Sequence, residues 1–90
     1  MKVKIYAIFD AKVGAYSQPF FSLSDGAAVR MFTDTVNGPV DLKTGMKNSV
    51  AAHPEDYRLD RIGVFDDENG TLVSDTSCLI QAAECVQKAE

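Results

Sequence analysis

Ninety residues make a single domain, 1–90, whose one core must hold nearly all of its apolar side chains. The hydrophobic fraction of 46% is ordinary for a globular chain, and no apolar run reaches the roughly 18 residues that a membrane-spanning helix needs. The net charge of −4 and the pI near 4.8 argue against a protein that holds nucleic acid by bulk electrostatics, because phosphate binding normally rests on clustered Lys and Arg.

The charge is unevenly distributed along the chain. Residues 1–54 carry six basic and four acidic side chains, for a net +2, whereas residues 55–90 carry three basic and nine acidic ones, for a net −6. A basic surface from the first half can therefore coexist with an acidic second half that competes with DNA or meets a basic partner.

Residues 2–10 alternate as a half-buried strand does. One face carries Val3, Ile5, Ala7 and Phe9, and the other carries Lys2, Lys4 and Tyr6. The apolar run is short, meets Asp10 and lacks a clear cleavage site, so we expect a strand rather than a signal peptide, and a protein that stays in the cytoplasm.

An aromatic segment follows a connection over residues 14–19. Phe20, Phe21 and Leu23 fit either a short edge strand or an aromatic plug under the next helix. Pro19 restricts any central strand here.

The clearest helix begins after Ser24, which is a good N-cap. Ala28, Met31, Phe32 and Val36 form its apolar stripe, which we interpret as core packing. Asn37-Gly38-Pro39 ends the helix, because Gly accepts the left-handed cap and Pro prevents continuation.

Residues 39–52 lack a sustained period, which predicts a long loop or a weak helical turn. Lys43, Met46 and Lys47 give this segment a basic, slightly apolar tip, so it is either a functional loop or a solvated excursion. Residues 53–57 then predict a tight turn, with Pro54 setting φ.

Residues 53–73, HPEDYRLDRIGVFDDENGTLV, predict a β-hairpin. The turn covers residues 67–70 and ends on Asn-Gly, a pair that accepts positive φ. A loop of about four residues places Val64 opposite Val73 and Phe65 opposite Leu72, whereas a two-residue loop wastes these cross-strand contacts.

The last segment, 75–90, predicts a C-terminal helix or tail. Asp75, Thr76 or Ser77 can cap a helix with an apolar stripe of Leu79, Ala82, Ala83 and Val86, which suits a docked or dimerising helix. In such a helix Cys78 and Cys85 lie roughly 10 Å apart, so we expect no intrachain disulfide and two structural thiols.

No enzyme chemistry is predicted. Carboxylates are numerous between residues 56 and 68, but acids in a hairpin turn normally serve the turn, and catalytic pairs need opposed environments. The lone His53 and the two thiols lack metal-ligand spacing, and no phosphate loop or nucleophile elbow appears. We therefore expect no catalytic residue, no metal and no cofactor.

Three stretches, in this order, carry a family resemblance: KIYAIFDAKVGAYSQPFF, the helix AAVRMF followed by VNG, and HPEDYRLDRIGVFDDENGTL. They resemble the small nonstructural DNA-binding protein of gokushoviruses, the tailless single-stranded DNA phages of the Microviridae. The resemblance spans residues 2 to about 73. Its most specific parts are KIYAIFD, HPEDY and the Ile62-Gly63-x-Phe65-Asp66 run, while residues 39–52 and those beyond Asp75 do not match.

The resemblance implies a protein that binds phage DNA during genome replication. It helps the switch from duplex replication to single-strand synthesis and packaging, acts in the cytoplasm of the bacterial host, and is absent from the mature virion. The acidic balance of this chain departs from a simple DNA-coating role.

The residues themselves suggest a surface for such binding. Tyr6 with Lys2 and Lys4, and Phe65 with Arg61, supply rings for bases and cations for phosphates, and they form a stacking platform if both faces lie on one side of the sheet. The alternative is that Phe65 is core and the lysines are merely solvated. Further candidates are Tyr16 and Arg58, with the Lys43 and Lys47 loop as a second surface.

These patterns predict an α+β fold with a mainly antiparallel sheet of three or four strands, covered by the Ser24 helix and by the C-terminal helix. The predicted partners are single-stranded DNA, phage replication or capsid proteins, and a second copy of the chain, with no membrane. The alternative function is an interaction module that recruits replication or capsid-assembly components through the acidic half.

Overall fold

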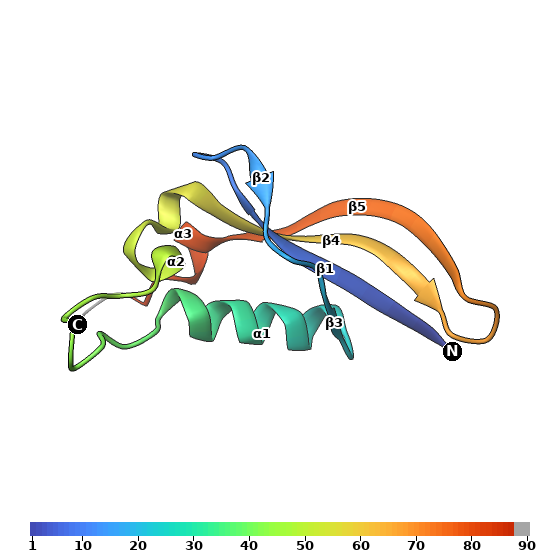
Figure 1. Ribbon diagram of the computed structural model, residues 1–90, viewed down its shortest axis with the longest axis horizontal. Coiled ribbons are helices and arrows are strands. Elements are labelled where there is room, and N and C mark those ends of the chain that lie inside the picture. The colour runs from blue at the N-terminus through green and yellow to red at the C-terminus, as the bar shows by residue number, and fades with distance from the viewer. Residues whose placement is uncertain (88–90) are drawn as a thin grey trace.

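The computed structural model describes residues 1–87 and contains one antiparallel sheet with helices on one side (Figure 1). Its three long strands are β1 (Lys2–Asp10), β4 (Tyr57–Asp66) and β5 (Thr71–Gln81). The short strands β2 (Ala15–Tyr16) and β3 (Phe20–Ser22) both pair with β1, so the order is β2-β1-β4-β5 with β3 beside β1. The predicted α+β class is confirmed, with five strands instead of three or four.

Helix α1 (Asp25–Val36) begins and ends where the sequence predicts. The Ser24 hydroxyl accepts a hydrogen bond from the Ala27 N–H and caps the helix. Ala28, Phe32 and Val36 are buried, as expected of the apolar stripe, but Met31 is 39% exposed and lies on the solvent side.

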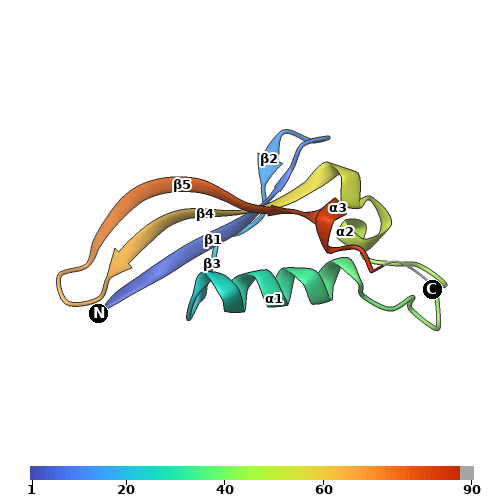
Figure 2. The ribbon, with the colours of Figure 1, turned by 180° about the vertical axis from the view of Figure 1, so that it is seen from behind.

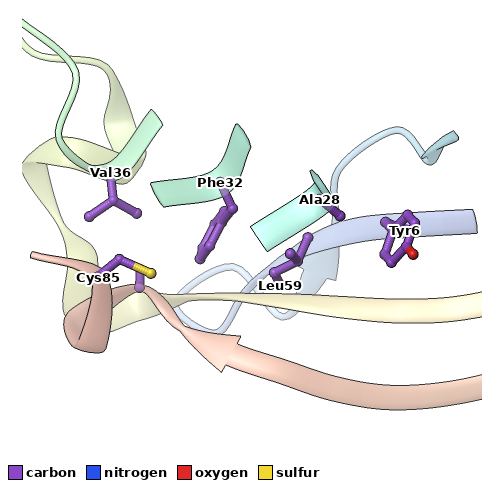
Figure 3. Close-up of a cluster of buried hydrophobic side chains, with 7 residues drawn as sticks. Tyr6, Ala28, Phe32, Val36, Leu59 and Cys85 are labelled. Atoms are coloured by element: carbon purple, nitrogen blue, oxygen red, sulfur yellow. The ribbon is translucent and has the colours of Figure 1, made fainter. Parts of the chain in front are cut away.

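The core lies between α1 and the sheet (Figure 3). Its buried members are Tyr6, Ala28, Phe32, Val36, Leu59, Ala82 and Cys85. Phe20 stacks on Tyr6 with ring centroids 5.9 Å apart, while the neighbouring Phe21 is exposed. Segment 20–22 is therefore an edge strand that also supplies an aromatic plug, which joins the two predicted alternatives.

The hairpin has the predicted register. Val64 pairs with Val73 and Phe65 with Leu72, and Gly70 adopts a φ of 72° at the end of the turn. The segment 39–52, predicted as a long loop or a weak helical turn, is a loop over residues 39–48 followed by the short helix α2 (Ser49–Ala52), and a 3₁₀ turn, η1 (Pro54–Asp56), comes next. No helix in the described residues is long and apolar enough to span a membrane.

The sequence predicts the start of the C-terminal helix too early in the chain. Strand β5 continues to Gln81, and only α3 (Ala82–Cys85) is helical. Backbone hydrogen bonding to β4 outweighs the tendency of this segment to form a helix, because the ten residues of β4 carry N–H and C=O groups that need partners. Cys78 is therefore an exposed strand residue and Cys85 a buried helical one, and both are free thiols. The predicted tail residues 88–90 lie outside the described part.

The sheet has a covered face and an open face. Helix α1 packs on the face that carries Tyr6 and Leu59 (Figures 1 and 2). In β4, Ile62 is an extra residue, since Ile5 pairs with Gly63 while Tyr6 pairs with Arg61. We call the side facing away from α1 the open face.

Candidate nucleic-acid interface

The open face carries most of the accessible aromatic rings. Residues paired across antiparallel strands point to the same side, and Val3 pairs with Phe65, Ile5 with Phe21, and Phe9 with both Tyr16 and Arg58. These pairs lie on the side opposite Tyr6 and Leu59. The open face is made of Val3, Ile5, Phe9, Tyr16, Phe21, Arg58, Asp60, Phe65 and Leu72.

One end of this face holds a layered group that we call the Arg58 cluster: Phe9, Tyr16, Arg58 and Asp60. The rings of Phe9 and Tyr16 lie 4.8 Å apart at 59°, and the Arg58 guanidinium carbon lies 4.2 Å from the Phe9 centroid. This is a cation–π contact on a ring that is itself packed against a second ring. Tyr16 remains 44% exposed, so the cluster presents a ring and a cation to solvent.

Asp60 is the buried member of the Arg58 cluster and binds two of the other side chains. It is only 1% exposed, and its carboxylate accepts hydrogen bonds from the Tyr16 hydroxyl at 2.7 Å and from Arg58 Nε at 3.1 Å. The hydrogen bond to Asp60 raises the pKa of both Tyr16 and Arg58, because each loses a partner when it deprotonates. A buried charge with these two partners is compensated and holds the guanidinium in place.

The other end of the open face is an apolar hollow. Phe21 and Phe65 lie with ring centroids 6.2 Å apart, and together with Val3 and Asp67 they line a shallow hollow of about 250 Å³. Phe21 is 61% exposed and Phe65 is half-buried. The open face thus carries a ring pair at each end.

Tyr6 does not belong to this surface, and the predicted Tyr6–Phe65 platform is wrong. Tyr6 is fully buried on the covered face, where its hydroxyl donates to Asp25 at 2.7 Å. Burial, followed by that hydrogen bond, raises its pKa to about 12. Tyr6 and Phe65 therefore lie on opposite faces of the sheet.

Arg61 and Lys4 are also on the covered face. Arg61 donates to Asp25 at 2.6 Å, and Lys4 Nζ lies 3.8 Å from the same carboxylate. These cations join the sheet to the N-terminus of α1, a structural role that the sequence did not reveal. Arg61 also lies 3.9 Å from Asp75 of β5.

The remaining predicted cations are separate from the open face. Lys2 is exposed and lines a hollow of about 380 Å³ with Val64 and Val73 on the other side of the hairpin. Lys43 and Lys47 are exposed in the 39–48 loop, at the opposite end of the molecule from the hairpin tip (Figure 1). Among the predicted residues the structure therefore brings together Tyr16 and Arg58, while Phe65 lies on the same face at its other end.

Within the Arg58 cluster and the Phe21–Phe65 pair, three residues were not predicted as site residues: Phe9, Phe21 and Asp60. Phe9 was assigned to the apolar face, and that assignment is right for the strand. The spacing of Arg58 and Asp60 is the signal that could have found the cluster, because residues two apart in a strand share a face.

One surface group has metal-ligating atoms close together. The donor atoms of His53, Glu55 and Asp56 lie within 4.8 Å of one another, and His53 Nδ1 is 3.9 Å from Glu55. His53 and Glu55 are exposed and Asp56 is half-buried. These three side chains are the ones that could hold a cation in the described residues, but they lack the buried ligands of a structural site.

The comparisons with known proteins identify the family. A family model described as Phage ORF5 protein matches residues 3–85. Neither a curated protein nor a solved structure matches the chain. Because the match covers well over half of the sequence, this chain belongs to the Phage ORF5 protein family and is a phage protein.

Proposed function

We propose that this phage protein binds single-stranded DNA, with little sequence preference, on the open face of its sheet. The observation that carries the proposal is the pair of ring clusters, Phe9 with Tyr16 and Phe21 with Phe65, on the face that α1 leaves uncovered. Every base has a π-face, so stacking on such rings tolerates any sequence.

Arg58 supplies the cation of the proposed interface. Its side chain is 33% exposed, and Asp60 accepts its hydrogen bonds from Nε, so Asp60 does not use the two terminal nitrogens of the guanidinium. A guanidinium held in this way suits a phosphate oxygen between stacked bases. Duplex DNA fits the surface less well, because its bases are already stacked on one another.

In the phage we place this binding at genome replication, at the switch to single-strand synthesis and at packaging, as the gokushovirus resemblance implies. The protein then acts in the host cytoplasm and leaves before the virion matures. The role is one of binding, with no catalytic step.

Fluorescence anisotropy with labelled single-stranded and duplex oligonucleotides at roughly 50 mM salt tests the proposal. Phe21→Ala and Tyr16→Ala should each weaken single-strand binding by about 5- to 150-fold, the range given by roughly 1–3 kcal/mol per stacked base. Met31→Ala, on the solvent side of α1, is the matched control and should change nothing.

A second function is favoured by the acidic tip of the hairpin. Asp66, Asp67 and Glu68 gather there, and the N-terminal ammonium of Met1 lies 2.8 Å from Asp67. Such a tip suits a basic protein surface. Absence of DNA binding, together with co-purification of a phage replication or capsid protein, would establish this interaction module instead.

A further inference from the structure

Strand β5 forms one long edge of the sheet. It hydrogen-bonds to β4 on one side and is the last strand in the order β2-β1-β4-β5. All residues from Thr71 to Thr76 are exposed, and this end of the hairpin projects beyond α1 (Figure 2). The opposite edge is made of the short strands β2 and β3.

From Thr71 to Ser74, where its pairing with β4 is regular, the β5 edge lacks the usual protection against pairing. Natural edge strands are blocked by Lys, Pro, bulges or short length. Strand β5 has eleven residues, contains no Lys, Arg or Pro, and carries one charge, Asp75. Leu72 and Val73, on opposite faces of the strand, are 69% and 60% exposed.

The direction of the backbone groups shows which residues can pair outward. The Val73 carbonyl oxygen lies against Gly63 of β4, only 2.7 Å from where a Cβ on Gly63 would stand. Val73 thus points its polar backbone groups inward. Because these directions alternate along a strand, Leu72 and Ser74 point their N–H and C=O groups to the free edge.

We propose that the β5 edge pairs with the β5 edge of a second copy, antiparallel, about a two-fold axis beside Val73. Residues paired across two antiparallel strands point to the same face of the sheet. In a symmetric pair of β5 strands, the two-fold axis must therefore pass beside one residue, which pairs with the same residue of the second copy. At Val73 the outward groups of Leu72 meet those of Ser74 in the partner, and the pairing is self-complementary. It joins the two sheets into one.

Other axis positions suit the edge less well. An axis at Asp75 sets two carboxylates against each other, which is unfavourable. With an axis at Leu72, the paired stretch would end after three residues, because the hairpin turn begins there. With an axis at Ser74, the paired stretch would include residues 75 and 76, where the pairing between β4 and β5 is irregular. An axis at Val73 centres the contact on residues 71–74, which pair with β4 in regular register, and sets Asp75 opposite Thr71.

The interface is small. Standard protein interfaces use roughly 20–30 residues a side, whereas the proposed pairing uses only residues 71–75 of each copy, so we expect a dimer that dissociates in the micromolar range and above. The proposal is independent of DNA binding. It concerns the free protein.

Disulfide trapping in the full chain tests the axis. In a Cys78→Ser background, Val73→Cys should give the highest yield of covalent dimer under mild oxidation, since it meets its own copy. Leu72→Cys and Ser74→Cys should give less. Val13→Cys, exposed on the β1–β2 turn, is the matched control for random collision.

A proline pair tests the edge without new cysteines. Ser74→Pro removes an outward N–H and should keep the monomer folded while raising the dimer dissociation constant about tenfold or more, measured by sedimentation. Val73→Pro removes an inward bond to β4 and should lower the melting temperature instead. A concentration-independent monomer, or equal trapping at Val73 and Val13, overturns the proposal.

Discussion

Asp25 joins the first turn of α1 to the sheet through three partners. Tyr6 and Arg61 donate to its two oxygens and Lys4 lies 3.8 Å away. The Tyr6 hydrogen bond, then the charges of Arg61 and Lys4, lower the pKa of Asp25 below its usual value. Its place at the positive end of the helix dipole acts in the same direction.

The native state should therefore lose stability in acid through Asp25. A folded pKa below the unfolded value of 3.8 contributes stability that is present above pH 3.8 and lost as the pH falls through the folded pKa. Asp25→Asn should lower the melting temperature at pH 7 and lower it less at pH 3. Parallel melting curves across this range would contradict the assignment.

Tyr6 should titrate late and cost stability in base. Its folded pKa of about 12 lies above the unfolded value of 10.0, so its contribution is present below pH 10 and is lost as the pH rises towards 12. The phenolate absorbance of the parent minus that of Tyr6→Phe gives this titration directly. A difference midpoint near pH 10 would show that Tyr6 is not held by Asp25.

Residue patterns placed Tyr6 correctly beside Lys2 and Lys4 but could not say which part of that face is covered. Lys2 lies beyond the end of the helix, Lys4 reaches its first turn, and Tyr6 lies under it. One strand face thus changes from solvent to core within a few residues. This depends on where α1 crosses the sheet, which alternation does not encode.

At the scale of elements, the hairpin was predictable because the cross-strand apolar pairs and the Asn-Gly turn point to one register. The continuation of β5 beyond Val73 was not, because Ser, Thr and Asp at residues 74–77 also resemble a helix cap. The hydrogen-bonding demand of β4 decides the outcome. These hydrogen bonds join residues that are distant in the sequence, so the sequence of residues 74–81 alone does not indicate them.

The hairpin turn should be sensitive at Gly70. Its φ of 72° lies in the left-handed region, so Gly70→Ala should destabilise the fold by about 1–2 kcal/mol. Gly26→Ala is the matched control, because Gly26 is in the first turn of α1, where an added Cβ would make only an ordinary contact with Ser24 Oγ at 3.8 Å, and it should gain about 0.5–1 kcal/mol. Urea unfolding measures both. Equal effects at the two sites would contradict the turn geometry.

At the scale of the whole molecule, the fold class followed from the sequence but the open face did not. The residue patterns predict a sheet with a covering helix, and α1 packs on only one side of that sheet. Which side stays open is set by the crossover from β3 into α1. Strand pairing places Tyr6 and Phe65 on opposite sides and sets Phe9, Tyr16 and Arg58 on one side, and the crossover decides that this last side stays open.

The distribution of charge predicts an unusually weak salt dependence of DNA binding. Arg58 is the cation of the open face, whereas Lys2, Lys43 and Lys47 lie elsewhere. Each phosphate neutralised on single-stranded DNA contributes a slope of about −0.7 in log K against log salt. We therefore expect a slope of about −0.7 to −1.4, far from that of a protein that coats DNA electrostatically.

Arg58→Gln should bring this slope close to zero, while the double variant Lys43→Ala and Lys47→Ala should leave it unchanged. Removal of Arg58 leaves Asp60 buried with Tyr16 as its remaining partner, so thermal unfolding must accompany the titration. Binding loss with an intact fold assigns the phosphate contact to Arg58. If the slope instead comes closer to zero only in the lysine variant, the DNA contacts the 39–48 loop, because the cations that release counterions are then in that loop.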